Sequence, residues 1–274
     1  GNAAPAVAAY AAKGKLPCIV LMPQKTPELR YLQSKAYGAK IFLVDGSIND
    51  CLEMSKEIAK VTGYHNCCTS SSMNPYQIEG NKTIAFEIVE DIQNIPDWVA
   101  VPVGGGGLLS GIVKGFEELK KGKVINKIPK ILAVQAKNCA PLVEAFLNND
   151  VIRKIENVKE TIALTIALPY PLDGTVALEC IRRSNGIAVA VTEEEIIQAT
   201  LNLSSELGIL AEPSGAVSFA GLLNAVSRDI IQPGETCVAV VTGSGLKSIE
   251  IYNKAKGSVL KVSGNVKELM KYLN

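Results

Sequence analysis

The sequence is poor in the side chains that metal sites and histidine-dependent catalytic triads need. It contains one histidine, His65, among 274 residues. Its seven cysteines are an odd number, and no two of them form a Cys-x-x-Cys pair. This pattern predicts no metal site and no disulfide framework. It favours free, mostly buried thiols in a reducing cytoplasm.

Excess charge of one sign and long apolar runs are also missing. Lys and Arg total 28 against 27 Asp and Glu, so a net charge of +1 gives no bulk attraction for nucleic acid or an anionic membrane. No apolar stretch reaches the roughly 18 residues of a transmembrane helix. The first residues show neither the basic nor the apolar region of a signal peptide. With 47% hydrophobic and 5% aromatic residues, we expect a cytoplasmic globular protein with a large aliphatic core.

What is present is an alternation of strand and helix patterns. Short runs rich in Val, Ile and Leu are typical of parallel strands buried on both faces, and helical spacing separates them. The predicted strands are residues 16–22, 40–44, 98–103, 131–135 and 236–241. The predicted helices are residues 6–13, 27–37, 48–61, 79–92, 108–119, 193–207 and 214–226. Residues 148–173 are expected to be irregular, and the whole pattern predicts an α/β fold with open sheets.

Helix 193–207 carries the clearest local start signal in the sequence. Thr192 precedes it and Glu195 follows three residues later, which is the pattern of a capping box.

Four consecutive glycines, Gly104 to Gly107, are the strongest functional feature. They follow a buried strand and open a helix, so backbone N–H groups and the helix dipole converge where a phosphate would bind. Neither the P-loop pattern nor G-x-G-x-x-G fits these glycines, which favours a small phosphorylated cofactor over a nucleoside triphosphate or a dinucleotide. The alternative is a turn whose glycines only let neighbouring elements pack closely.

A second strand end carries the segment 242–247 (TGSGLK). Ligands of open α/β sheets bind at the carboxyl ends of strands. The glycine loop and a hydroxyl at Thr242 would therefore bracket one flat cofactor.

Five segments together resemble the threonine synthase family. They are Gly1-Asn2 and residues 73–80 (MNPYQIEG), 101–107 (VPVGGGG), 211–216 (AEPSGA) and 242–247 (TGSGLK). That family belongs to the fold type II pyridoxal-phosphate enzymes and is related to the serine/threonine dehydratases. The resemblance implies two open, twisted, mostly parallel sheets flanked by helices, as in the tryptophan synthase β subunit. It also implies a smaller domain over 1–85, a larger cofactor-binding domain over 86–274, and a homodimer.

The resemblance implies a role for each matching residue. Asn2 would bond the 3′-hydroxyl of pyridoxal 5′-phosphate, and Thr242 would face its pyridine nitrogen. The cofactor phosphate would be held by Gly104, Gly105, Gly106, Gly107 and the N–H of Leu108. The substrate would be held by Ala3, Ser71, Ser72 and Gln77. For Asn2, the alternative is a plain helix N-cap.

Three of these positions depart from the family pattern. Threonine synthases have arginine at the position of Gln77, asparagine at Ser71 and threonine at Ala3. A neutral amide in place of a guanidinium loses charge-assisted bonds to a phosphate, worth about 1.5–3 kcal/mol each. The departures therefore weaken O-phosphohomoserine as substrate and favour an unphosphorylated amino acid. Residues 167–174 also depart, with no expected role beyond shaping the pocket.

The family's Schiff-base lysine lies upstream of its Ser-Gly-Asn motif. We therefore expect that lysine upstream of Gly1, an N-terminally incomplete chain, and no activity from these residues alone. Three functions remain open. They are threonine synthase, serine/threonine ammonia-lyase, and a non-catalytic ligand-binding fragment.

Overall fold

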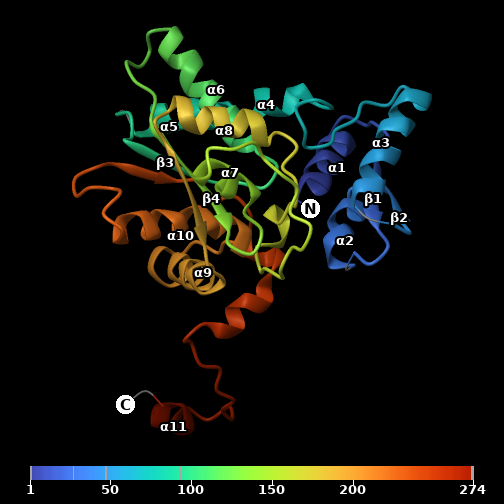
Figure 1. Ribbon diagram of the computed structural model, residues 1–274. Helices are drawn as coiled ribbons and strands as arrows, with labels where there is room; N and C mark the ends of the chain where they lie inside the picture. The colour runs from blue at the N-terminus through green and yellow to red at the C-terminus, as the bar shows by residue number, and fades with distance from the viewer. Residues whose placement is uncertain (1, 27, 47, 93, 273–274) are drawn as a thin grey trace.

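The computed structural model describes residues 2–26, 28–46, 48–92 and 94–272 (Figure 1). Their six strands form two sheets in which every paired strand is parallel, with the orders β1-β2 and β5-β4-β3-β6. The strands are β1 (Ile19–Pro23), β2 (Lys40–Val44), β3 (Trp98–Pro102), β4 (Lys130–Ala136), β5 (Ile187–Val191) and β6 (Cys237–Ala239). The predicted fold class is confirmed. The opening Gly1 of the first family segment lies outside the described residues.

Helices cover both faces of the larger sheet (Figure 1). Helices α5 (Thr83–Ile92), α6 (Gly107–Lys121) and α8 (Gly174–Arg183) pack on one face. Helices α9 (Glu193–Leu207) and α10 (Pro213–Ser227) pack on the other. This arrangement explains the apolar runs, because a strand covered on both faces has no side that can carry polar residues.

Alternate residues of β3 serve the two cores. Val99 and Val101 pack with Phe116 of α6, whereas Trp98 and Ala100 pack on the side of α9 and α10. All five residues of β3 are buried. The period of two that separates these sets follows directly from strand geometry.

The smaller sheet is covered less completely than we expected. Its helices are α1 (Ala3–Lys13), α2 (Leu29–Ala36) and α3 (Ile48–Thr62). Val20 and Met22 of β1 are buried, but Phe42 and Leu43 of β2 are each 43% exposed. Buried and half-buried residues alternate along β1, so the prediction that residues 16–22 form a strand buried on both faces is wrong within the described residues. The physical reason is that the described part of this sheet has two strands and a small apolar core.

Local signals placed some helices well and others poorly. The capping box of α9 is present, with Glu195 N–H donating to Thr192 Oγ1 at 3.2 Å, and Gly208 ends the helix at φ +67°. The single helix predicted over 79–92 is instead α4 (Pro75–Asn81) and α5. The chain turns between them at Lys82, whose N–H bonds back to Ile78 O.

Several elements were not predicted, among them α7 (Pro141–Leu147), α8 and β5. Residues 148–173 are mostly irregular as expected, with one short 3-10 helix, η1 (Leu164–Ile166).

The two sheets lie apart in Figure 1, with β1, β2 and α1 to α3 on the right. Helices α4 and α5 contact α6 and so belong with the larger sheet. The predicted domain boundary at residue 85 stays a prediction.

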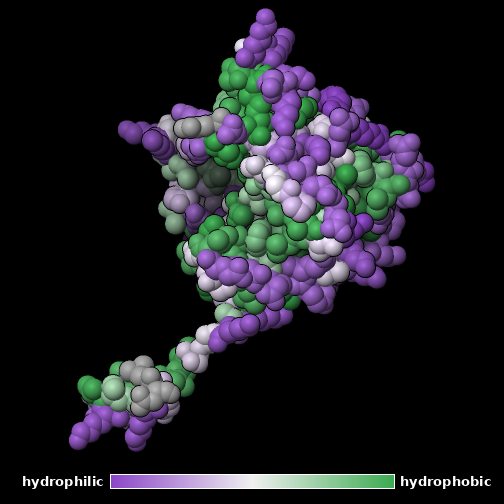
Figure 2. All heavy atoms as spheres, turned by 90° about the vertical axis from the view of Figure 1, so that its left-hand side faces the viewer, coloured by the Kyte–Doolittle hydropathy of each residue, from purple (hydrophilic) through white to green (hydrophobic). Residues whose placement is uncertain are grey.

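The C-terminal segment stands away from the body in both views (Figures 1 and 2). It follows the 3-10 helices η2 (Gly245–Lys247) and η3 (Ile249–Lys254) and ends in α11 (Val266–Leu269) and η4 (Met270–Tyr272). Val259 in this segment is 96% exposed.

All seven cysteines are free, as expected, but only Cys51, Cys139 and Cys180 are buried, so the expectation of mostly buried thiols is wrong. Burial raises the pKa of the Cys180 thiol, which keeps it protonated and unreactive. Within the described residues, no helix has the length and apolar character that crossing a bilayer requires.

A carboxylate ties the start of β3 to the segment before β6. Glu235 accepts hydrogen bonds from Trp98 Nε1 (3.1 Å), Gln232 N–H (2.7 Å) and Lys130 Nζ (3.1 Å). The Gln232 N–H, and after it the Lys130 ammonium, lower the pKa of Glu235. Because the folded pKa is depressed, the carboxylate stabilises the fold above the ordinary glutamate pKa of about 4.3, and this contribution is lost as the pH falls through the folded value.

We therefore expect Glu235→Gln to lower the urea midpoint at pH 7 and to change it little at pH 3. Urea unfolding followed by the fluorescence of Trp98, the only tryptophan, measures both midpoints. The control is Glu194→Gln, at an exposed carboxylate on α9. An equal loss at both pH values would contradict this role of the Glu235 charge.

Candidate active site

A crevice is expected where the chain order reverses in the larger sheet. From β3 the chain proceeds through β4 to β5 on one side, and it then returns to pair β6 with the other side of β3. The loops after β3 and β6 therefore leave the same sheet edge in different directions, and this is where open α/β sheets bind ligands. The glycine loop and Thr242 follow these two strands, so the fold brings both predicted segments to one edge.

The glycine loop presents unpaired donors. None of the N–H groups of residues 104–108 donates a hydrogen bond to another described residue. Gly106 is the N-cap of α6 and has φ +96°, in the left-handed region that glycine tolerates. Unpaired amides at the positive end of a helix dipole suit a phosphate.

Close packing explains part of the glycine run. A Cβ at Gly104 would lie 3.0 Å from Ile166 Cα, and one at Gly106 would lie 2.8 Å from Asp173 O. At Gly105 the nearest described atom would be 3.7 Å away, an ordinary contact. Packing therefore requires glycine at positions 104 and 106 but not at position 105. A ligand that approaches the backbone closely would account for the glycine at position 105.

Asn2 lies at the start of α1, but its side chain does not cap the helix. Its Nδ2 donates to Glu212 Oε1 at 2.6 Å, and its Oδ1 accepts from Lys247 Nζ at 2.9 Å. The N-cap position is thus confirmed without the capping bond. The side chain instead joins the turn after β6 to the start of α10.

Thr242 is exposed, and its hydroxyl bonds to no other described residue. The next residue packs tightly, because a Cβ at Gly243 would lie 2.1 Å from Glu212 Oε1. The turn is therefore held from behind while the hydroxyl stays available to a ligand.

Two of the predicted substrate residues meet at the first residue of α6. Ser71 donates to Asp173 Oδ1 through its N–H (2.9 Å) and its Oγ (2.5 Å). The amide of Gln77 and Asp173 Oδ2 both lie against the position that a Cβ of Gly107 would occupy, at 3.4 Å and 2.9 Å. Asp173 is 4% exposed, and neither its Oδ2 nor Gln77 Oε1 has a hydrogen-bond partner among the described residues.

The other predicted residues take simpler positions. Ser72 Oγ lies 3.0 Å from Ser70 Oγ, Ala3 is in the first turn of α1, and Leu108 packs on the apolar core. Lys82 is ion-paired with Glu79 at 2.6 Å, and hydrogen bonds to Glu79 and then Glu118 raise the pKa of Lys82. Lys82 is therefore already neutralised and does not replace the missing arginine.

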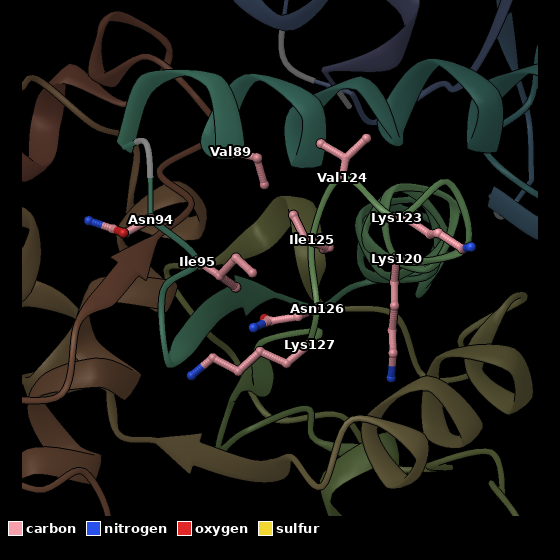
Figure 3. Close-up of a pocket in the computed structure, with 9 residues that line it drawn as sticks. All are labelled: Val89, Asn94, Ile95, Lys120, Lys123, Val124, Ile125, Asn126 and Lys127. Atoms are coloured by element: carbon pink, nitrogen blue, oxygen red, sulfur yellow. The ribbon is translucent and has the colours of Figure 1, made fainter.

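A cavity of about 770 Å³ lies away from the glycine loop and Thr242 (Figure 3). It is lined by residues that precede β3 and β4, such as Ile95 and Lys127, so it lies at the amino ends of the strands. Its three lysines point in different directions in Figure 3, and Lys127 is paired with Asp97 at 2.9 Å. Position and charge both argue against catalysis there.

A second hollow lies against Ser71, one of the four predicted substrate residues. It has a volume of about 360 Å³, and Ser71, Asp173, Ser110 and Cys180 are among its lining. Lys114 and Arg183 also line it, but Lys114 is paired with Glu79 and Arg183 with Glu117. The hollow thus offers a phosphate no lysine or arginine without a carboxylate partner among its described lining.

Comparison with known proteins decides the family. The sequence profile of the family "Pyridoxal-phosphate dependent enzyme" matches residues 1–243. The chain belongs to this family. It is 39% identical to a threonine synthase of Methanocaldococcus jannaschii over 277 aligned positions, which cover 100% of this chain and 67% of that protein. It is 38% identical to a threonine synthase of Mycobacterium tuberculosis, covering 96% of this chain and 70% of the relative.

Solved structures show the same fold. Threonine deaminase isoform 2 from Solanum lycopersicum superposes with a TM-score of 0.74 at 24% identity, covering 92% of this chain and 67% of that one. Maize serine racemase superposes with a TM-score of 0.73 at 24% identity, covering 100% and 75%. These comparisons confirm the resemblance to threonine synthases, the fold type and the pyridoxal-phosphate cofactor. They also confirm the prediction that the protein is a lyase of this family.

The described residues fit that cofactor. Unpaired amides at residues 104–108 would hold its phosphate, and Thr242 and Asn2 would meet its ring. Sequence reasoning did not single out Asp173, Glu212 and Lys247, which hydrogen-bond to the predicted site residues Ser71 and Asn2. Glu212 and Lys247 stood inside quoted family segments, and Asp173 inside the departing segment 167–174. What was lacking was knowledge of which of these side chains turn toward one another.

The glycine loop can be tested by separating packing from binding. Gly105→Asp should leave unfolding without cofactor nearly unchanged, because space exists for a Cβ, but its carboxylate should compete for the amides and abolish retention of pyridoxal phosphate. Gly106→Ala, strained at φ +96°, should lower stability by more than about 1 kcal/mol. Thermal unfolding and cofactor absorbance after gel filtration measure the two effects. Cofactor retention by Gly105→Asp would place the phosphate elsewhere.

Proposed function

We propose that this protein is a lyase of the threonine synthase type, which converts O-phosphohomoserine and water to threonine and phosphate. The observation that carries the proposal is the 39% identity to a threonine synthase across the whole chain. The crevice beside β3 and β6, with its unpaired amides, supports it.

Each predicted residue has a definite task in this proposal. Pyridoxal phosphate, when bound, withdraws electrons from the substrate's α-carbon and so makes its proton removable. The amides of Gly104 to Leu108 hold the cofactor phosphate, and Asn2 and Thr242 orient the ring. A hydroxyl at Thr242, unlike a carboxylate, does not enforce protonation of the pyridine nitrogen. Ala3, Ser71, Ser72 and Gln77 form the substrate side of the crevice.

One observation favours a second function, a serine/threonine ammonia-lyase. The buried Asp173 carboxylate lies with Gln77 where the resemblance implies the phosphate of the substrate, and both have an acceptor oxygen without a donor. A dianionic phosphate beside Asp173 would be repelled, whereas the hydroxyl of serine or threonine would supply the missing donor.

Assembly and location complete the proposal. The resemblance favours a homodimer, and the free thiols together with the relatives' biosynthetic role favour the cytoplasm. Sedimentation of the purified protein measures the first of these.

Removing the Asp173 charge and placing a cation at position 77 should together raise kcat/KM for O-phosphohomoserine. Gln77→Arg alone should gain little for O-phosphohomoserine, because the guanidinium would pair with Asp173. In an Asp173→Asn background, Gln77→Arg should raise kcat/KM roughly tenfold or more, equivalent to about 1.4 kcal/mol of transition-state binding. Asn keeps an acceptor for Ser71, which makes Asp173→Asn alone the matched control.

The assay uses a form of the protein that also carries the Schiff-base lysine expected upstream of Gly1. It follows phosphate release and threonine formation, beside 2-oxobutyrate formation from threonine. Efficient threonine formation by the unmutated protein, with no gain in the double variant, would show that another group binds the phosphate. Formation of 2-oxobutyrate without threonine synthesis would instead establish the second function.

A further inference from the structure

Four side chains form one hydrogen-bonded chain beside Thr242. Lys247 Nζ donates to Asn2 Oδ1 at 2.9 Å, and Asn2 Nδ2 donates to Glu212 Oε1 at 2.6 Å. Thr165 Oγ1 donates to the same Glu212 oxygen at 3.2 Å. These residues come from η2, the start of α1, the N-cap of α10 and η1. The hydrogen bonds therefore join four segments that are far apart in the sequence.

The charges at its two ends fix the orientation of the Asn2 amide. Its oxygen faces the Lys247 ammonium, which can only donate, and its nitrogen faces the Glu212 carboxylate, which accepts. A flipped amide would set N–H against the ammonium and C=O against the carboxylate. Both contacts would then be repulsive, so only one orientation is stable.

Glu212 is itself held rigidly. It is 3% exposed, its N–H donates to Gly243 O at 2.9 Å, and a Cβ at Gly243 would lie 2.1 Å from its Oε1. Only glycine lets the turn after β6 close over the carboxylate. The same residue therefore anchors both Asn2 and the turn that carries Thr242.

An asparagine amide has two N–H groups, and Glu212 uses one of them. We propose that Lys247 and Glu212 are positioning residues that keep the second N–H of Asn2 available to the 3′-oxygen of the cofactor. A donor at that oxygen favours its ionised form. This inference rests on the cofactor site in the proposed function, but it concerns residues to which that proposal gives no task.

The test uses pyridoxine 5′-phosphate, which carries the 3′-hydroxyl and the phosphate but has no aldehyde. Its binding therefore needs no lysine. The ultraviolet absorbance of the bound probe, titrated with pH, reports ionisation of its 3′-hydroxyl. We expect both Lys247→Met and Glu212→Met to raise the pH of this ionisation by about one unit, the size expected for losing a hydrogen bond to a charged oxygen.

The signs of the two shifts separate positioning from simple electrostatics. Loss of a nearby positive charge at Lys247 would raise the pKa of the 3′-hydroxyl, but loss of a negative charge at Glu212 would lower it. Positioning alone raises it in both variants. Lys247→Arg, which keeps a donor, should restore the unmutated titration. Tyr252, whose hydroxyl donates to Ala211 O, is the other titratable group of this corner, and burial raises its pKa away from the working range.

A lower pKa of the probe's 3′-hydroxyl in Glu212→Met would overturn the inference. So would a Lys247→Arg variant in which this pKa is raised as much as in Lys247→Met. If Glu212→Met does not fold, the Lys247→Met shift is compared at low salt and at about 1 M salt, where the Debye length is about 3 Å. A shift that persists supports positioning, and one that disappears overturns it.

A separate control isolates the cofactor site. If Gly105→Asp leaves the affinity for pyridoxine 5′-phosphate unchanged, the probe is not held by the glycine loop. The proposed cofactor site and the inference then fall together. If the probe binds normally and its binding depends on Gly105, but the pKa of its 3′-hydroxyl does not shift in the variants, only the positioning role of Lys247 and Glu212 is overturned.

Discussion

The parallel pairing of β3 with β4 on one side and β6 on the other is the constraint on which the site depends. It brings the glycine loop and the Thr242 turn to the same edge of the sheet, although about 135 residues separate them in the chain. Burial of β3 on both faces makes this edge rigid, because Val99 and Val101 are locked in one core and Ala100 in the other. The loops therefore leave a fixed platform.

Charge distribution gives the two ends of the crevice different characters. At the glycine loop, backbone amides and the dipole of α6 favour an anion. A few ångströms away, Asp173 adds a buried negative charge beside Gln77. The N-terminus of α6 therefore lies beside both the proposed position of the cofactor phosphate and a carboxylate that disfavours a second phosphate. Whether the substrate loses phosphate or a hydroxyl depends on whether the attraction of the amides and helix dipole for an anion exceeds the repulsion by Asp173.

Period and turn chemistry made much of the fold predictable. The VIL-rich runs located β1 to β4 and β6, and the Thr192–Glu195 box located α9, because these features depend on neighbouring residues only. β5, α7 and α8 were not predicted, although β5 is as long as β1, β2 and β3. Burial of β1 was overestimated, since an apolar run shows that a strand can be buried but not what covers it.

The sequence by itself pointed to the family and to its cofactor, because five short segments in the family's order are specific together although each is weak alone. It also nominated the glycines and hydroxyls that are proposed to meet that cofactor. Only the tertiary structure decided that Gly104 and Gly106 also serve packing, that Asp173 turns toward Gln77, and that Lys247 and Glu212 orient Asn2. These are contacts between residues about 60 to 245 positions apart. Such contacts depend on how separate elements pack, and no local pattern records that.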